Sequence, residues 1–121
     1  MFWWFMFISN MIISVILIFF GGLFIKNPPK TINKGFGYRT KRSMANIESW
    51  NLAHKTAGEV LFKSGVIMTI INIIVMLILY GKDTDLIGYI GGGLSVITIL
   101  TVFLAIPVTE KKLKEAFTEL I

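Results

Sequence analysis

The sequence of 121 residues contains no cysteine and a single histidine, His54. Disulfide scaffolds and thiolate metal sites therefore lack the residues that they need, and a single histidine leaves a His-rich metal site or a Ser-His-Asp triad almost no material. Phosphate-binding loops and nucleophile elbows are also absent from the sequence, and we expect neither a metal nor a cofactor. Charged residues make up 16% of the chain, against about 25% in a typical soluble domain. This shortage of charge excludes an ordinary soluble globule.

Apolar residues make up 55% of the sequence and gather in three long runs, residues 2–25, 60–80 and 86–108. Each run reaches the ~20 residues that a helix needs to cross a bilayer, and a helix satisfies its own backbone groups there. We therefore predict an all-α membrane protein with three transmembrane helices. We expect the first run to be retained rather than cleaved as a signal peptide, because no basic residue precedes Lys26 and no small-residue cleavage site follows.

The net charge of +5 is distributed unevenly along the chain. Of the 12 basic residues, 11 lie in the loop 26–59, at Lys63 or in the tail 109–121, and Lys82 lies between the second and third runs. The positive-inside rule then predicts an N-terminus outside the cell, with the loop and the tail in the cytoplasm. The charge is placed to meet anionic lipid headgroups, and we expect no nucleic-acid partner.

The loop 26–59 is predicted to contain an interfacial amphipathic helix. Pro28 and Pro29 end the first helix, since proline cannot continue its hydrogen bonds. Ser43 can cap a new helix that begins at the next residue. An apolar stripe at helical spacing runs along this helix and comprises Ile47, Trp50, His54, Ala57 and Leu61. Such a helix would lie along the cytoplasmic interface and enter the second span near Gly58.

The tail 109–121 is predicted to form a short amphipathic helix after Pro107, with Thr109 as its N-cap. Its expected apolar face comprises Leu113, Ala116, Phe117 and Leu120. Its expected polar face comprises Lys111, Lys112, Lys114 and Glu115. This pattern is typical of a helix that lies on a membrane surface.

Small and amide side chains inside the runs predict how the helices pack. Gly88 and Gly92 lie four residues apart, a spacing that allows close contact between membrane helices. One expected partner is the chain's own bundle, and the alternative is a homo-oligomer through Gly88 and Gly92. Within the chain, the surface that would receive the third helix comprises Gly21, Gly22 and Gly65. Asn10 and Asn72 are expected to form hydrogen bonds between helices.

The loop carries the motif Gly37-Tyr38-Arg39-Thr40, and spaced residues accompany it: Asn33, Ser43, Asn46, Glu48, Trp50, Ala53, His54 and Gly58. This pattern, followed by a membrane helix, resembles the SdpI family of bacterial membrane proteins. The resemblance implies a role in immunity, since the family is named for a protein that shields a toxin-producing Bacillus from its own membrane-active peptide. That protein also resembles a sensor, because it recruits a transcriptional repressor to the membrane. The resemblance therefore implies a cytoplasmic regulator as a second kind of partner.

The candidate binding site comprises Asn33, Gly37, Tyr38, Arg39, Thr40, Ser43, Glu48, Trp50, His54 and Gly58. Arg39 lies at its centre, in a glycine-flexed turn beside Tyr38, and its planar guanidinium suits a phosphate or a carboxylate. The alternative for Arg39 is a structural salt bridge to Glu48. Trp50 is expected to be an interfacial anchor, and His54 a hydrogen-bonded packing residue.

Three functions remain open on the sequence. The first is a binding and protection module, in which the loop engages a peptide toxin or a cytoplasmic regulator, and the family resemblance favours it. The second is a small oligomeric transporter or a lipid-handling protein. The third is a membrane enzyme that acts on lipid headgroups with Arg39, Glu48 and His54.

Overall fold

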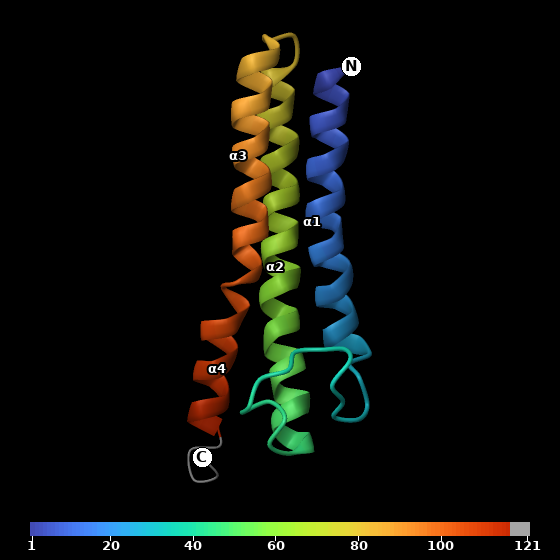
Figure 1. Cartoon of the computed structure of the whole chain (residues 1–121), viewed down its shortest axis with the longest axis vertical. Coiled ribbons are helices and arrows are strands. Elements are labelled where there is room, and N and C mark those ends of the chain that lie inside the picture. Colours follow the sequence, from blue (N-terminus) through green and yellow to red (C-terminus); the bar gives the residue numbers. More distant parts are fainter. Residues whose placement is uncertain (117–121) are drawn as a thin grey trace.

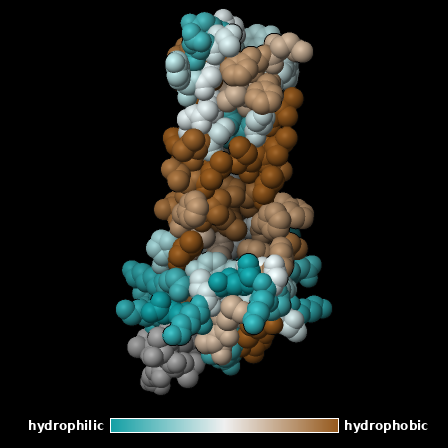
Figure 2. Space-filling model, in the orientation of Figure 1, coloured by the Kyte–Doolittle hydropathy of each residue, from teal (hydrophilic) through white to brown (hydrophobic). Residues whose placement is uncertain are grey.

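The computed structural model describes residues 1–116, which contain four α-helices and no strand. The helices are α1 (Phe2–Lys26), α2 (Ile47–Leu79), α3 (Thr84–Val102) and α4 (Ala105–Ala116). The first three run side by side, and α4 continues from α3 beside the start of α2 (Figure 1). Within the described residues, three segments are long and apolar enough to span a membrane: α1, α2, and α3 taken with α4. Apolar side chains form a broad band across the middle of the face shown in Figure 2. The predicted all-α architecture with three spans is confirmed.

The bundle has two different ends. The loop end carries residues 27–46 and α4, and the turn end carries the N-terminus and the turn between α2 and α3 (Figure 1). At the turn end the indole N–H of Trp3 donates a hydrogen bond to the carbonyl oxygen of Met76 (2.7 Å). The Trp3 ring also meets Tyr80 edge-on, with 5.0 Å between ring centroids. The start of α1 is thereby fixed against the end of α2.

Toward the loop end, α1 and α2 touch backbone to backbone. A Cβ atom added at Gly21 would lie 2.4 Å from the backbone nitrogen of Phe62, and one at Gly58 would lie 2.8 Å from the carbonyl oxygen of Gly21. A Cβ at Gly65 would collide with Ile18 of α1. These glycines therefore pack α1 against α2. The prediction that the third helix is received at Gly21, Gly22 and Gly65 is wrong.

A polar cluster joins the three long helices inside the bundle. The amide of Asn10 donates to the carbonyl oxygen of Gly91 (3.2 Å), and the hydroxyl of Ser95 donates to Oδ1 of Asn10. The amide of Asn72 donates to the backbone oxygen of Asn10 (3.4 Å). Because lipid offers no hydrogen-bonding alternative, such bonds help to fix the helices relative to one another. The predicted interhelical role of both asparagines is confirmed.

The glycines of α3 lie on different faces of that helix. Gly91 is buried against Met6 of α1, and a Cβ at Gly88 would meet the ring of Phe2 at 3.5 Å. A Cβ at Gly92 would meet nothing within 4 Å. Gly88 therefore contributes to packing within the chain, while Gly92 faces outward. A homo-oligomer through these two glycines stays a prediction.

α2 is a single helix of 33 residues that includes the segment predicted to lie along the interface. It begins at Ile47, where the side chain of Asn46 accepts a hydrogen bond from the backbone N–H of Ser49 (2.8 Å). The predicted start behind a Ser43 cap is therefore corrected, and the segment continues without a break into the span. Most of its predicted apolar stripe faces the inside of the protein: Trp50, His54, Ala57 and Leu61 are buried.

The third span bends at residues 103–104, between α3 and α4. Pro107 causes this bend, because it has no backbone N–H to offer the carbonyl oxygen of Phe103 and its ring crowds that carbonyl. The backbone makes turn-like bonds there instead, with the N–H of Ile106 donating to the oxygen of Phe103 (3.2 Å). The third span, predicted over residues 86–108, therefore consists of α3 and the start of α4 rather than one helix.

The predicted tail helix is the second half of α4 rather than a separate element. Thr109, the expected cap, lies inside α4 and is buried, as is Leu113 on the expected apolar face. Ala116, also assigned to that face, is exposed. The remaining members of that face, Phe117 and Leu120, lie outside the described residues. The expected polar face is exposed throughout: Lys111, Lys112, Lys114 and Glu115.

Candidate functional site

The Gly-Tyr-Arg-Thr motif forms a loop, residues 37–40, that lies against α2 at the loop end. Gly37 has a φ of 114°, which glycine adopts at little cost. A Cβ at this position would lie 2.5 Å from Nε2 of His54. The next backbone N–H, that of Tyr38, donates to the same Nε2 (2.9 Å). Glycine suits this position because the backbone lies against the Nε2 edge of the imidazole and leaves no room for a Cβ atom.

His54 and Trp50 form a buried pair on α2 that holds this loop. Both side chains are 0% exposed, and their ring centroids lie 4.4 Å apart. Nδ1 of His54 lies 2.7 Å from the carbonyl oxygen of Trp50, while Nε2 accepts from the loop, so the imidazole is neutral with its proton on Nδ1. The indole N–H of Trp50 donates to the carbonyl oxygen of Pro29 (2.8 Å). His54 is the packing residue predicted. Trp50 is buried and holds the segment before the loop through its bond to Pro29, so it is not an interfacial anchor.

Local hydrogen bonds fix the backbone on both sides of the 37–40 loop. The buried hydroxyl of Ser43 accepts from the backbone N–H of Thr40 (2.8 Å) and donates to the carbonyl oxygen of Tyr38 (2.9 Å). Before the loop, the side chain of Asn33 accepts from two backbone N–H groups (3.0 and 2.8 Å). Ser43 and Asn33 therefore shape the loop through bonds to its backbone.

Glu110 of α4 fastens the loop from the other side. Its Oε2 accepts hydrogen bonds from the hydroxyls of Tyr38 (2.7 Å) and Thr40 (2.9 Å), and its Oε1 lies 3.5 Å from Nη1 of Arg42 in an ion pair. Burial and the hydrogen bond to Glu110 raise the pKa of Tyr38, so its hydroxyl stays protonated and donates at physiological pH. Sequence reasoning missed Glu110, which lies 70 residues beyond Thr40 among tail lysines.

A cavity of about 320 Å³ lies between the 37–40 loop, α1, α2 and the bend after α3. Its walls outside the loop are apolar and comprise Phe24, Ala57, Leu61, Val102, Phe103, Ala105 and Ile106. Two of these side chains, Phe103 and Ile106, are also 58% and 46% exposed on the outside of the bundle. The cavity therefore adjoins the surface that would face lipid.

Arg39 also lines this cavity, and its side chain is exposed. Its Nη1 donates to the carbonyl oxygen of Lys34. The alternative partner, Glu48, is exposed at the start of α2. In the part of the chain described, the ion pair near the loop joins Arg42 and Glu110 instead. A guanidinium has five N–H donors, so the contact with Lys34 leaves most of them available to an anion.

The structure brings some of the predicted site residues together and separates others. The loop, Ser43, Trp50 and His54 form one assembly at the cavity. Gly58 instead lies at the crossing of α1 and α2, and Glu48 is on the surface. Glu48 and His54 of the enzyme alternative are therefore not brought together: Glu48 is exposed, and both ring nitrogens of buried His54 are hydrogen-bonded to backbone.

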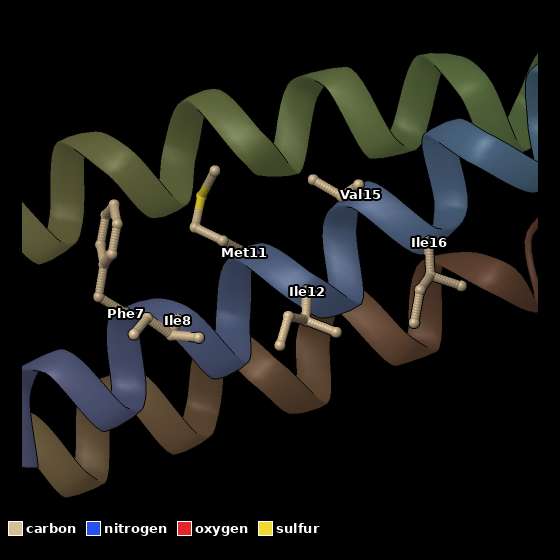
Figure 3. A pocket seen from close by; sticks show the side chains of 6 residues that line it. All are labelled: Phe7, Ile8, Met11, Ile12, Val15 and Ile16. Atoms are coloured by element: carbon tan, nitrogen blue, oxygen red, sulfur yellow. The ribbon is translucent and has the colours of Figure 1, made fainter.

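A second hollow, of about 300 Å³, follows the outer face of α1. Figure 3 shows the six side chains that line it, all from α1 and all apolar: Phe7, Ile8, Met11, Ile12, Val15 and Ile16. In a membrane this face would meet lipid chains. It offers no polar group that could orient a ligand, so the cavity at the 37–40 loop is the better candidate site.

The three apolar helical spans define a small multi-pass membrane protein. The pattern of the SdpI/YfhL protein family matches residues 30–109, which include the whole 37–40 loop, and the chain belongs to this family. The uncharacterized protein YfhL of Bacillus subtilis (strain 168) is 40% identical over 53 residues, which cover 43% of this chain and 48% of that relative. The chain thus matches about half the length of this relative. No solved structure matches the chain.

Proposed function

We propose that this protein is a binding module of the bacterial cell membrane that protects the membrane by holding a membrane-active peptide. The resemblance to an immunity protein gives the biological direction of this proposal. The observation that carries it is an apolar cavity that adjoins the lipid-facing surface and is lined at one side by the exposed Arg39.

The shape and lining of the cavity suit the apolar end of a peptide that lies in the bilayer. Ligand pockets commonly measure about 300–1,000 Å³, and this one, at about 320 Å³, lies at the small end of that range. It would admit a short apolar segment rather than a folded peptide. Exposed Phe103 and Ile106 mark the side from which such a segment would enter out of the lipid.

Arg39 supplies the polar contact that would orient the peptide. A guanidinium binds a carboxylate through two parallel hydrogen bonds, and lysine cannot reproduce this geometry. We infer that the peptide's C-terminal carboxylate binds Arg39 while the residues before it occupy the cavity. Anionic lipid phosphates share this chemistry, and the experiments below separate the two.

We also propose that the loop end faces the cytoplasm, which is supported by the 11 basic residues on that side. Because the chain has no cysteine, single cysteines report orientation without background. In intact cells, Lys41→Cys is expected to resist an impermeant thiol reagent, while Asp83→Cys is expected to react. Both positions are exposed in the structure. Labelling of position 41 with protection of position 83 would reverse the proposed orientation.

Arg39→Lys is expected to reduce protection at least about tenfold, because hydrogen bonds to charged groups typically contribute about 1.5–3 kcal/mol. The measurement uses a strain that lacks the gene, complemented with each variant and challenged with membrane-active peptides that have free C-termini. Inhibitory concentrations are compared at equal protein levels in the membrane. Charge is retained in this variant, so a loss of protection would indicate the lost guanidinium fork.

Lys41→Gln is the matched control for Arg39→Lys. Lys41 is an exposed cation next to the 37–40 loop that does not line the cavity, so its loss is expected to leave protection unchanged. Arg42 is unsuitable for this purpose, because it pairs with Glu110. Full protection by Arg39→Lys would contradict the proposed site, and an equal loss with Lys41→Gln would indicate attraction to the lipid surface alone.

A further inference from the structure

α4 is attached to the rest of the protein by a bend at one end and a polar clasp near its middle. The bend at residues 103–104 lacks continuous helical hydrogen bonds because of Pro107. The clasp consists of the Glu110 carboxylate and the three side chains that bond to it, Tyr38, Thr40 and Arg42.

The apolar attachment of α4 is small by comparison. Its buried residues are Ala105, Thr109 and Leu113, so Leu113 is its one large buried apolar side chain. The third buried residue, Thr109, is polar and lies beside the hydroxyl of Tyr38. Much of the attachment of α4 therefore depends on Glu110.

α4 also forms one wall of the cavity. Ala105 and Ile106 line it from the first turn of α4, and Phe103 lines it from the bend. Two of the residues that bind Glu110, Tyr38 and Thr40, belong to another wall, since they are part of the 37–40 loop. The clasp thus connects the wall formed by α4 to the wall formed by the 37–40 loop.

We propose that α4 is a hinged lid of this cavity, which turns about residues 103–104 when the Glu110 clasp opens. Opening separates the 37–40 loop from α4 and exposes the apolar walls laterally. Closing restores the hydrogen bonds of Glu110. The inference rests on the proposed function only for what enters the cavity, because the motion belongs to the protein without a ligand.

Distances between two spin labels test the lid in the absence of any peptide. Lys55→Cys on α2 and Lys112→Cys on α4 place the labels at exposed positions of the cysteine-free chain. In lipid nanodiscs the parent is expected to give one main distance. Glu110→Ala is expected to add a longer distance and to raise the ratio of open to closed protein at least about tenfold, because it removes hydrogen bonds to a charged group.

Two further variants keep the test independent of one substitution. Tyr38→Phe combined with Thr40→Val removes both hydroxyl donors and is expected to open the lid as Glu110→Ala does. Glu115→Ala removes an exposed carboxylate from the same helix and is expected to leave the distances unchanged. A second label pair, Ile12→Cys with Ile74→Cys on exposed faces of α1 and α2, is expected to keep one distance in every variant.

Unchanged distances in both clasp variants would overturn the lid. A longer distance at the second label pair would also overturn it, since Glu110 would then hold the whole bundle and not a lid. So would an equal opening with Glu115→Ala. A failure of the proposed function looks different: Arg39→Lys would protect cells fully while the label distances still respond to Glu110.

Discussion

Gly21→Ala is expected to lower the free energy of unfolding by about 3 kcal/mol, at the upper end of the usual cost of overpacking. The new Cβ would lie 2.4 Å from the backbone nitrogen of Phe62 and 2.8 Å from the carbonyl oxygen of Gly58. Both neighbours are backbone atoms, so α1 and α2 must separate to make room. Thermal unfolding of the purified protein in detergent, followed by circular dichroism, measures the effect.

Gly22→Ala is the matched control, one residue further along the same helix. Its Cβ would meet only the Phe62 ring, at 4.0 Å, which is ordinary van der Waals contact. Its melting temperature is expected to stay close to that of the parent, because alanine also favours the helix. Equal melting temperatures for the two variants would contradict the close backbone crossing of α1 and α2.

Trp50→Ala is expected to cost about 3–5 kcal/mol of stability, the usual range for removing a buried tryptophan. The substitution removes the ring that packs on His54 and the hydrogen bond to the carbonyl oxygen of Pro29. The 37–40 loop should lose its support, so trypsin is expected to cleave after Arg39 faster than in the parent. Thermal unfolding and the rate of proteolysis together measure both consequences.

Two tryptophan variants separate a buried fastening from a membrane anchor. Trp4→Ala changes a side chain that is 54% exposed at the turn end and is expected to leave both the melting temperature and the rate of cleavage after Arg39 nearly unchanged. Trp50→Phe keeps a ring and loses one hydrogen bond, with an expected cost of about 1 kcal/mol from that bond. Equal, small effects of Trp4→Ala and Trp50→Ala would restore the interpretation of Trp50 as an interfacial anchor.

The sequence predicts the spans well because their cause is local. An uncharged run such as residues 2–25 must form a helix in lipid, whatever its neighbours are. The turn at Gly37 was also expected, since glycine adopts positive φ at little cost. The partners of Asn10 and Asn72 were also expected in outline, because an amide inside a membrane needs another polar group.

The remaining features depend on contacts between distant residues. Nothing near Glu110 in the sequence indicates that Tyr38 and Thr40 donate to it, because the bend after α3 decides where α4 lies. The apolar stripe of Trp50 and His54 has the same spacing whether it faces lipid or protein, and the loop folded over it settles the outcome. Helical periodicity alone could not distinguish these two environments.

Direct binding tests the role of Arg39 most closely. The peptide against which the protein protects cells is prepared with a free C-terminus and with an amidated one, and each form is titrated against parent and Arg39→Gln protein in nanodiscs. Amidation is expected to weaken binding to the parent at least about tenfold, as expected for losing a hydrogen-bonded charge. The same amidation is expected to leave binding to Arg39→Gln unchanged. An equal effect of amidation on both proteins would contradict a carboxylate bound at Arg39.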